Sequence, residues 1–134
     1  MDWTLELVIV PVSDVDRAKE FYSDKVGFHV DLDHQVTDDV RIVQLTPPGS
    51  GCSICISSGM TNAAPGSSAG LQIVVPDIGR AHAELTERGV DVSAVRHMEG
   101  GRWVDGRGGT WNSFVHFTDP DGNPWTVQEA PGGR

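Results

Sequence analysis

The chain has 134 residues, and its 10 basic and 19 acidic side chains give a formal net charge of -9 at neutral pH. This length suits one domain spanning 1–134, and a hydrophobic content of 38% is enough to build a core, which argues against wholesale disorder. The acidic balance argues against nucleic acid and anionic membranes as partners, because both require a basic face. With no long apolar run and no secretory pattern, we expect a soluble, cytoplasmic protein without a membrane segment.

The predicted elements follow one order twice along the chain. The first half predicts an apolar strand ending near Val12, a helix after Asp14, and strands at 28–32, 40–45 and 52–57. The second half predicts a strand at 71–75, a helix after Asp77, and strands at 90–95, 112–117 and 125–129. Each half therefore reads strand, helix, strand, strand, strand, which is an α+β pattern.

An internal repeat supports this division. An offset of 63 residues aligns Asp14 with Asp77, Arg17 with Arg80, and the residues around each pair. We expect module 1 at about 1–60, a linker at 61–68 rich in small residues, and module 2 at about 69–131. The chain is predicted to contain two copies of one unit.

Local signals mark the ends of both helices and one turn. Asp14 (or Ser13) and Asp77 are suitable N-caps, and Gly27 and Gly89 stand where a left-handed helix stop is expected. The segment 119–123 places Pro and Gly as in a type I turn that reverses the chain into the last strand.

Cys52 and Cys55 have the spacing of redox and metal motifs. Residues three apart on a strand point to opposite faces, however, and no helix follows to lower a thiol pKa. We therefore expect small strand residues here, without a disulfide or zinc site.

The segments 12–22 and 117–123, together with Gly27-Phe28, resemble the vicinal oxygen chelate superfamily. This superfamily includes glyoxalase I, extradiol dioxygenases, fosfomycin-modifying enzymes and bleomycin-resistance-type drug-binding proteins. The resemblance implies two tandem βαβββ modules that form a curled, cup-shaped mixed sheet with helices on its outer face, usually completed by dimerisation.

Enzymes of the superfamily bind a metal on the cup floor. The corresponding positions here are Leu7, Cys55, Gly70 or a neighbour, and Thr126, of which only Cys55 is a strong ligand. The resemblance thus implies no metal and no cofactor. A relocated metal site using His29, His34, His97 or His116 remains the alternative.

Strand alternation predicts which side chains face the cup. Val10, Val12, Trp125 and Val127 are expected beneath the helices, so their alternating neighbours should form the floor. The predicted lining is apolar or neutral: Trp3, Leu5, Leu7, Ile9, Gln44, Cys55, Phe114, His116, Thr126 and Gln128. Such a surface suits a small-molecule pocket, and the alternative is a face covered by a dimer partner.

The segment 97–111 reads as the longest irregular stretch, with five glycines and two tryptophans, Trp103 and Trp111. Indoles and guanidinium groups on a mobile loop suit stacking over a flat ligand. A dimer contact and plain disorder are the alternatives.

Together these features predict a homodimeric protein that binds and sequesters a hydrophobic, polycyclic aromatic small molecule or antibiotic, as in self-resistance, in a metal-free cleft at the dimer interface. The prediction leans against an enzyme and names no catalytic residue. The alternatives are a glyoxalase-like lyase, isomerase or dioxygenase with a relocated metal, or a metal-free biosynthetic catalyst using His116.

Overall fold

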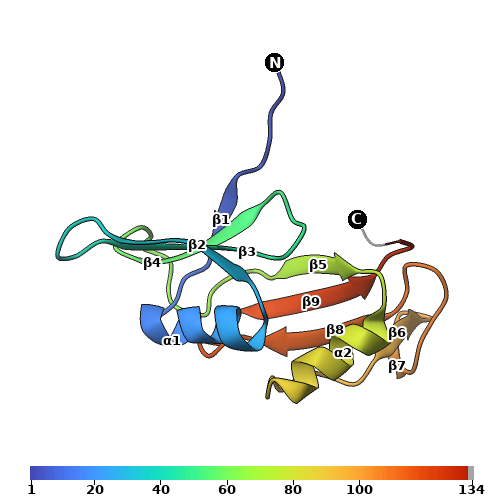
Figure 1. The fold of residues 1–134 in the computed structure, drawn as a ribbon. Helices are drawn as coiled ribbons and strands as arrows, with labels where there is room; N and C mark the ends of the chain where they lie inside the picture. Colours follow the sequence, from blue (N-terminus) through green and yellow to red (C-terminus); the bar gives the residue numbers. More distant parts are fainter. Residues whose placement is uncertain (133–134) are drawn as a thin grey trace. The chain divides into compact units, whose positions relative to one another are not determined.

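The computed structural model describes residues 1–132 (Figure 1). It divides the chain into two compact units. Unit 1 comprises Met1–Ser68 and Asp119–Asn123, and the described residues of unit 2 are 69–118 and 124–132. Each unit contains one mixed sheet and one helical segment, so the α+β class expected from the sequence is confirmed.

Unit 1 has the predicted order of strand, helix and three strands. Its elements are β1 (Leu7–Ile9), α1 (Val15–Glu20) with a π-helical continuation η1 (Phe21–Lys25), β2 (His29–Gln35), β3 (Arg41–Thr46) and β4 (Ser53–Ser58). The strands lie in the order β1-β4-β3-β2, with β1 parallel to β4 and the other pairs antiparallel. Strand β4 is therefore central, and five of its six residues are buried.

The predicted helix ends in unit 1 are confirmed. The Asp14 side chain accepts a hydrogen bond from the Arg17 amide at 3.1 Å, which satisfies one of the free N–H groups of the first turn. After η1, Gly27 adopts a φ of 90°, a left-handed conformation that ends the helix. Tyr22 and Phe28 stack beneath the sheet with ring centroids 5.8 Å apart.

The turn 119–123 has two buried side chains, Asp119 and Asn123, that connect it to the rest of unit 1. The Asp119 carboxylate is only 4% exposed, and it accepts hydrogen bonds from the Tyr22 hydroxyl at 2.7 Å and from the Asn123 amide at 2.9 Å. The Asn123 side chain in turn donates to the Pro11 carbonyl at 2.8 Å. A buried carboxylate needs such partners, so this motif stabilises the fold in addition to reversing the chain at Gly122.

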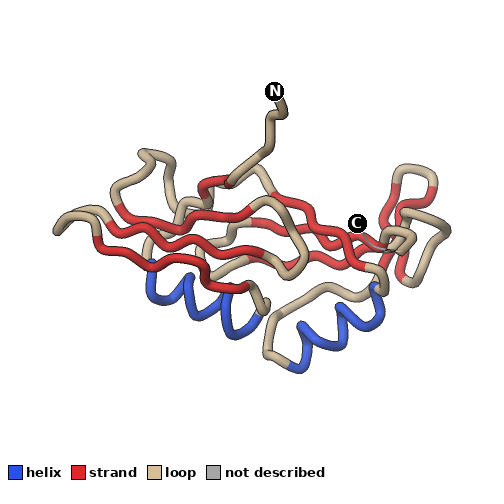
Figure 2. The backbone as a smooth tube through the Cα atoms, turned by 45° about the horizontal axis from the view of Figure 1, so that its top comes forward, coloured by secondary structure: helices blue, strands red, loops and turns tan. Residues whose placement is uncertain are grey.

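Unit 2 has one more strand than unit 1 among the residues described. Its elements are β5 (Leu71–Val75), α2 (Ile78–Glu87), β6 (Arg96–Glu99), β7 (Arg102–Asp105), β8 (Phe114–Thr118) and β9 (Pro124–Glu129). The strands lie in the order β5-β9-β8-β6-β7, with β5 parallel to β9. Figure 2 shows the helix of each unit against its own strands.

The core of unit 2 lies between α2 and the sheet. Val115, Phe117, Trp125 and Val127 are each less than 5% exposed, and the Phe117 and Trp125 rings stack with centroids 6.0 Å apart. Because strand residues alternate, their neighbours on β8 and β9 point to the opposite face. Between residues 1 and 132, no helix is long and apolar enough to cross a bilayer.

Two sequence expectations in unit 2 are wrong. Residues 90–95 form no strand, since the Val90 amide is used at the end of α2, where it donates to the Leu85 carbonyl. The segment 97–111 was expected to be irregular throughout, but 97–105 belongs to the β6–β7 hairpin. Gly100 and Gly101 have φ values of 59° and 78°, as a two-residue type I′ turn requires.

Candidate functional site

The face of the unit 2 sheet opposite α2 carries the predicted polar and aromatic residues of β8 and β9. Phe114 pairs with Gln128, and His116 pairs with Thr126, so the four side chains lie on one surface. Gln72 on β5 extends the row through its pairing with Thr126. The four predicted residues are half-buried. Local strand register therefore brings them together as alternation predicts.

An aromatic cluster forms where the β6–β7 hairpin meets β8. The Trp103 ring lies edge-on to Phe114 at 5.2 Å and to His116 at 5.0 Å between centroids. Phe114 and His116 are nearly parallel, 6.3 Å apart. Trp103 remains 44% exposed, so part of its indole is available to another molecule. Offset and edge-on ring contacts of this kind stabilise aromatic ligands as well as side chains.

Arg96 completes this cluster. Its Nε and Nη2 groups donate to His116 Nδ1 at 3.2 and 3.0 Å, and its guanidinium carbon lies 5.3 Å from the Trp103 ring centroid. Burial, and secondarily the Arg96 charge, lower the pKa of His116 below its ordinary value. The donor geometry assigns Nδ1 as the unprotonated nitrogen, so His116 is a neutral imidazole with its proton on Nε2.

Gln128 connects the sheet to the segment containing Trp111. Its side chain accepts from Gln72 Nε2 at 2.7 Å and donates to the Trp111 carbonyl at 2.7 Å. Trp111 has a φ of 65°, which is uncommon for a residue with a Cβ. Its side chain is 41% exposed.

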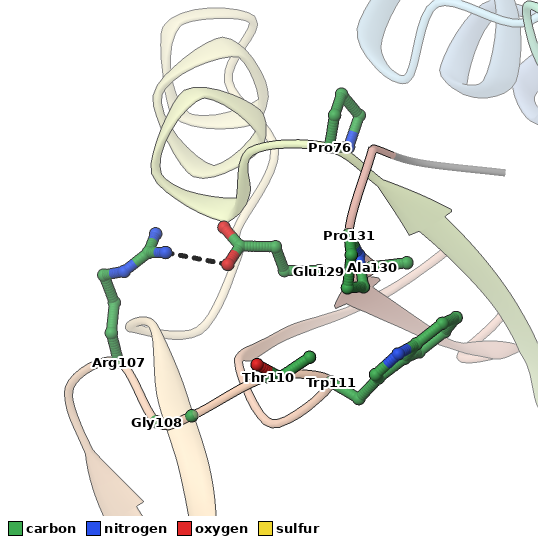
Figure 3. A pocket seen from close by; sticks show the side chains of 9 residues that line it. Pro76, Arg107, Gly108, Thr110, Trp111, Glu129, Ala130 and Pro131 are labelled. Carbon is green, nitrogen blue, oxygen red and sulfur yellow. Dashed lines mark hydrogen bonds and ion pairs between the residues drawn. The ribbon is translucent and has the colours of Figure 1, made fainter.

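A separate cavity of about 270 Å³ lies beside the N-terminus of α2 (Figure 3). It is lined by Pro76, Arg107, Gly108, Gly109, Thr110, Trp111, Glu129, Ala130 and Pro131. Glu129 accepts from Arg107 at 2.7 Å and from the Ile78 amide at 2.9 Å, so its two oxygens are both engaged. The cavity is smaller than the roughly 300–1,000 Å³ usual for drug-sized ligands. It suits a substituent rather than a whole polycyclic molecule.

The residues of unit 1 that were predicted to line the cup are apolar or neutral. Cys55 pairs with Ile9 on one side and Gln44 on the other, and Cys55 is only 2% exposed. Leu7 is half-buried. Trp3 and Leu5 precede β1, outside any strand, and are 87% and 70% exposed. The role of these residues in ligand binding stays a prediction.

The residues at the positions of the superfamily metal site do not fit a divalent ion. Leu7 and Gly70 have no ligating side-chain atom, Thr126 offers a neutral hydroxyl, and Cys55 is a single thiol. Throughout residues 1–132, no group of three or more His, Cys, Asp or Glu side chains is arranged to hold a metal.

His97 makes contacts within the β6–β7 hairpin and with the residue that follows it. Its Nδ1 lies 2.8 Å from the Gly106 carbonyl, and its Nε2 lies 3.1 Å from Glu99. The Gly106 carbonyl, and then Glu99, raise the pKa of His97, because both favour a doubly protonated ring.

Sequence reasoning missed Arg96, Arg107 and Glu129 as residues of these surfaces. Arg96 fell between an expected strand and an expected loop. The Gly100-Gly101 pair, flanked by two four-residue stretches, was the available signal, because two glycines between such stretches indicate a tight hairpin. The Arg107–Glu129 ion pair has no comparable local signal, since the two residues are 22 positions apart.

The chain belongs to the Glyoxalase/Bleomycin resistance protein/Dioxygenase superfamily, whose family model matches residues 4–127. The resemblance stated from the sequence is confirmed. The mixed sheets and flanking helices described above are consistent with this assignment.

Two solved structures from Streptomyces sp. CB03234 are similar to this chain. One is TnmS3, an antibiotic binding protein, with 32% identity, a TM-score of 0.76, and coverage of 96% of this chain and 97% of that one. The other is a glyoxalase/bleomycin resistance protein with 33% identity, a TM-score of 0.73, and coverage of 93% and 99%. The uncharacterized protein YetH of Bacillus subtilis (strain 168) is 27% identical over 124 residues, covering 91% of this chain and 94% of YetH.

Proposed function

We propose that the protein binds and sequesters a hydrophobic, polycyclic aromatic small molecule of the antibiotic type, without metal and without turnover, in the cytoplasm. The observation that carries this proposal is the half-exposed cluster of Trp103, Phe114 and His116, on a sheet face where the β8 and β9 side chains are uncharged. The similarity to TnmS3, an antibiotic binding protein, supports the same role.

The chemistry of the cluster favours flat ligands. A planar ring system can stack on the exposed part of Trp103 and remove apolar surface of both partners from water. Gln128 and Gln72 supply hydrogen-bonding groups at the edge of the surface, which can orient a polar substituent. A binding surface needs only these elements, whereas catalysis by a metal would need ligands that the superfamily positions do not provide.

The proposal extends to a homodimer. Trp3 and Leu5 are large apolar side chains that a monomer leaves in water, on the N-terminal segment that extends away from β1 (Figure 1). Covering them with a second copy would remove this exposed surface. Light scattering of the wild type against a Trp3→Ser/Leu5→Ser variant tests this point, and an unchanged molar mass contradicts it.

The main test is titration of intrinsic tryptophan fluorescence and thermal unfolding with a panel of polycyclic aromatic antibiotics and dyes. We expect saturable quenching, a stoichiometry of about one ligand per chain, and a rise in unfolding temperature, because a ligand that binds only the folded state stabilises it. Chelator treatment should leave binding unchanged. A panel in which no compound alters emission or unfolding temperature contradicts the proposal.

A further inference from the structure

The aromatic cluster of unit 2 presents hydrogen-bond donors that lack acceptors. A guanidinium carries five N–H groups, and Arg96 directs only its Nε and Nη2 groups to His116 Nδ1. For the rest of this guanidinium, residues 1–132 supply no hydrogen-bond acceptor, and no carboxylate lies within 4.0 Å. His116 Nε2, the protonated nitrogen of the neutral ring, is likewise a donor with no acceptor among those residues. The guanidinium lies over the Trp103 ring, and Nε2 is part of the His116 ring. Both donors are therefore next to the rings against which an aromatic ligand would pack.

The surrounding charges leave Arg96 as the cation of this surface. Asp105 is its cross-strand neighbour on the hairpin, yet the guanidinium turns toward His116 and Trp103 and forms no ion pair with it. Glu99 points to the opposite face of the hairpin from Arg96, and there it is paired with His97. On β8 and β9 the facing groups, Phe114, Thr126 and Gln128 among them, are uncharged.

We propose that the aromatic ligand of unit 2 carries an oxyanion, either a carboxylate or a phenolate, which accepts hydrogen bonds from the Arg96 guanidinium and His116 Nε2. This inference rests on the proposed function and names the chemical class of its ligand. Hydrogen bonds from a cation to an anion are stronger than neutral ones, so the charged substituent fixes the orientation of the ring system. The net charge of -9 favours cationic ligands at long range, so a preference for an anion must come from the local donors.

The wild-type protein tests the inference with probes that share one ring system and differ in charge. Anthracene-9-carboxylate, anthracene-9-carboxamide and 9-(aminomethyl)anthracene carry negative, zero and positive charge at neutral pH. We expect the carboxylate to bind about tenfold more tightly than the amide, as one charge-assisted hydrogen bond allows, and the ammonium to bind most weakly. At pH 8, 4-nitro-1-naphtholate and its neutral methyl ether test in the same way whether the oxyanion can be a phenolate, and the naphtholate should bind more tightly.

The outcomes separate the two proposals. If the carboxylate and the naphtholate bind no more tightly than their neutral partners, or if the ammonium binds best, the oxyanion inference is overturned. The proposal of aromatic binding then stands. If no probe binds, the proposed function itself is contradicted.

Variants locate the preference. Arg96→Gln should abolish the advantage of the carboxylate, measured as the ratio of the carboxylate and amide dissociation constants in the same variant, and Arg96→Lys should retain part of it. Asp105→Asn is the matched control, because it changes a charge on the same hairpin without touching His116; the carboxylate preference should persist or increase. An undiminished preference in a folded Arg96→Gln variant overturns the inference.

Discussion

The sheets of the two units share the order of four strands, unit 2 adds β7 at the edge, and the predicted binding faces differ in chemistry. In unit 1, Gln44 lies between Cys55 and Leu32 in an uncharged row with no aromatic ring. In unit 2, His116 pairs with Thr126 on β9 and lies among Trp103, Phe114 and Arg96. The difference arises from the β6–β7 hairpin, which brings Arg96 and Trp103 beside β8. The added hairpin and the side chains of β8 together therefore give unit 2 its different surface.

The largest expected effect comes from disturbing the segment that follows this hairpin. Gly108 is packed so closely that an added Cβ would overlap the Asn112 carbonyl and the His97 Cβ. Gly108→Ala should lower the free energy of unfolding by about 2–3 kcal/mol and weaken aromatic binding, because backbone must shift. Denaturant unfolding measures the first effect. Gly109→Ala is the matched control, since no atom lies within 4 Å of its Cβ position, and equal losses in both variants would contradict this explanation.

A second prediction asks which face binds aromatic compounds. Trp103→Ala should weaken binding of the aromatic compound about tenfold, as the loss of one aromatic contact allows. Trp3→Ala should change the dissociation constant little, because Trp3 lies outside the aromatic cluster of unit 2. Calorimetric titration with the tightest compound of the panel measures both. A larger loss at Trp3 would move the binding surface to unit 1 or to a dimer contact.

Unit 1 contains a cluster of ion pairs around Asp33. Asp33 accepts from Arg41 at 2.9 Å and from Lys19 at 2.7 Å, and these hydrogen bonds hold the pKa of its carboxyl far below the ordinary value of 3.8. A lowered pKa contributes stability above the unfolded pKa, and this stability is lost as the pH falls through the folded value. Asp33→Asn should cost about 1 kcal/mol of unfolding free energy at pH 7 and progressively less below pH 4. Asp38→Asn, at an exposed position outside the strands, should be neutral at both pH values.

The smallest effects concern the two histidines of unit 2, whose pKa values are shifted in opposite directions. The lowered pKa of His116 costs stability as the pH falls below about 6.5, because the unfolded chain then binds the proton more readily. The raised pKa of His97 contributes stability below that pH and loses it as the pH rises through the folded value. His116→Gln should therefore make the protein relatively more stable at pH 5.5 than at pH 7.5, and His97→Gln relatively less. Denaturation midpoints at the two pH values check this, and shifts of the same sign would contradict it.

Much of the fold could be predicted because its signals are local. Asp14 and Asp77 cap helices, and Gly27 and Gly89 end them, through bonds and dihedrals set within a few residues. Alternation correctly assigned the buried face of β8 and β9, since one set of side chains must lie under α2. The hairpin was missed because a glycine-rich segment was interpreted by its flexibility alone, although two positive φ values are what a type I′ turn requires.

By itself, the sequence determined the α+β class, the duplication and the superfamily, because these depend on periodicity and on motifs read in order along the chain. The tertiary structure decided the chemistry of the candidate site. Arg96 and His116 are 20 residues apart, and Trp103 and Phe114 are 11 apart, so strand pairing had to bring them into contact. The state of His116 also depends on that contact, since a neighbouring guanidinium and partial burial favour the neutral ring. The sequence shows which residue types are available. The distances that decide where a proton resides, or which ligand charge a site prefers, exist only in the folded protein.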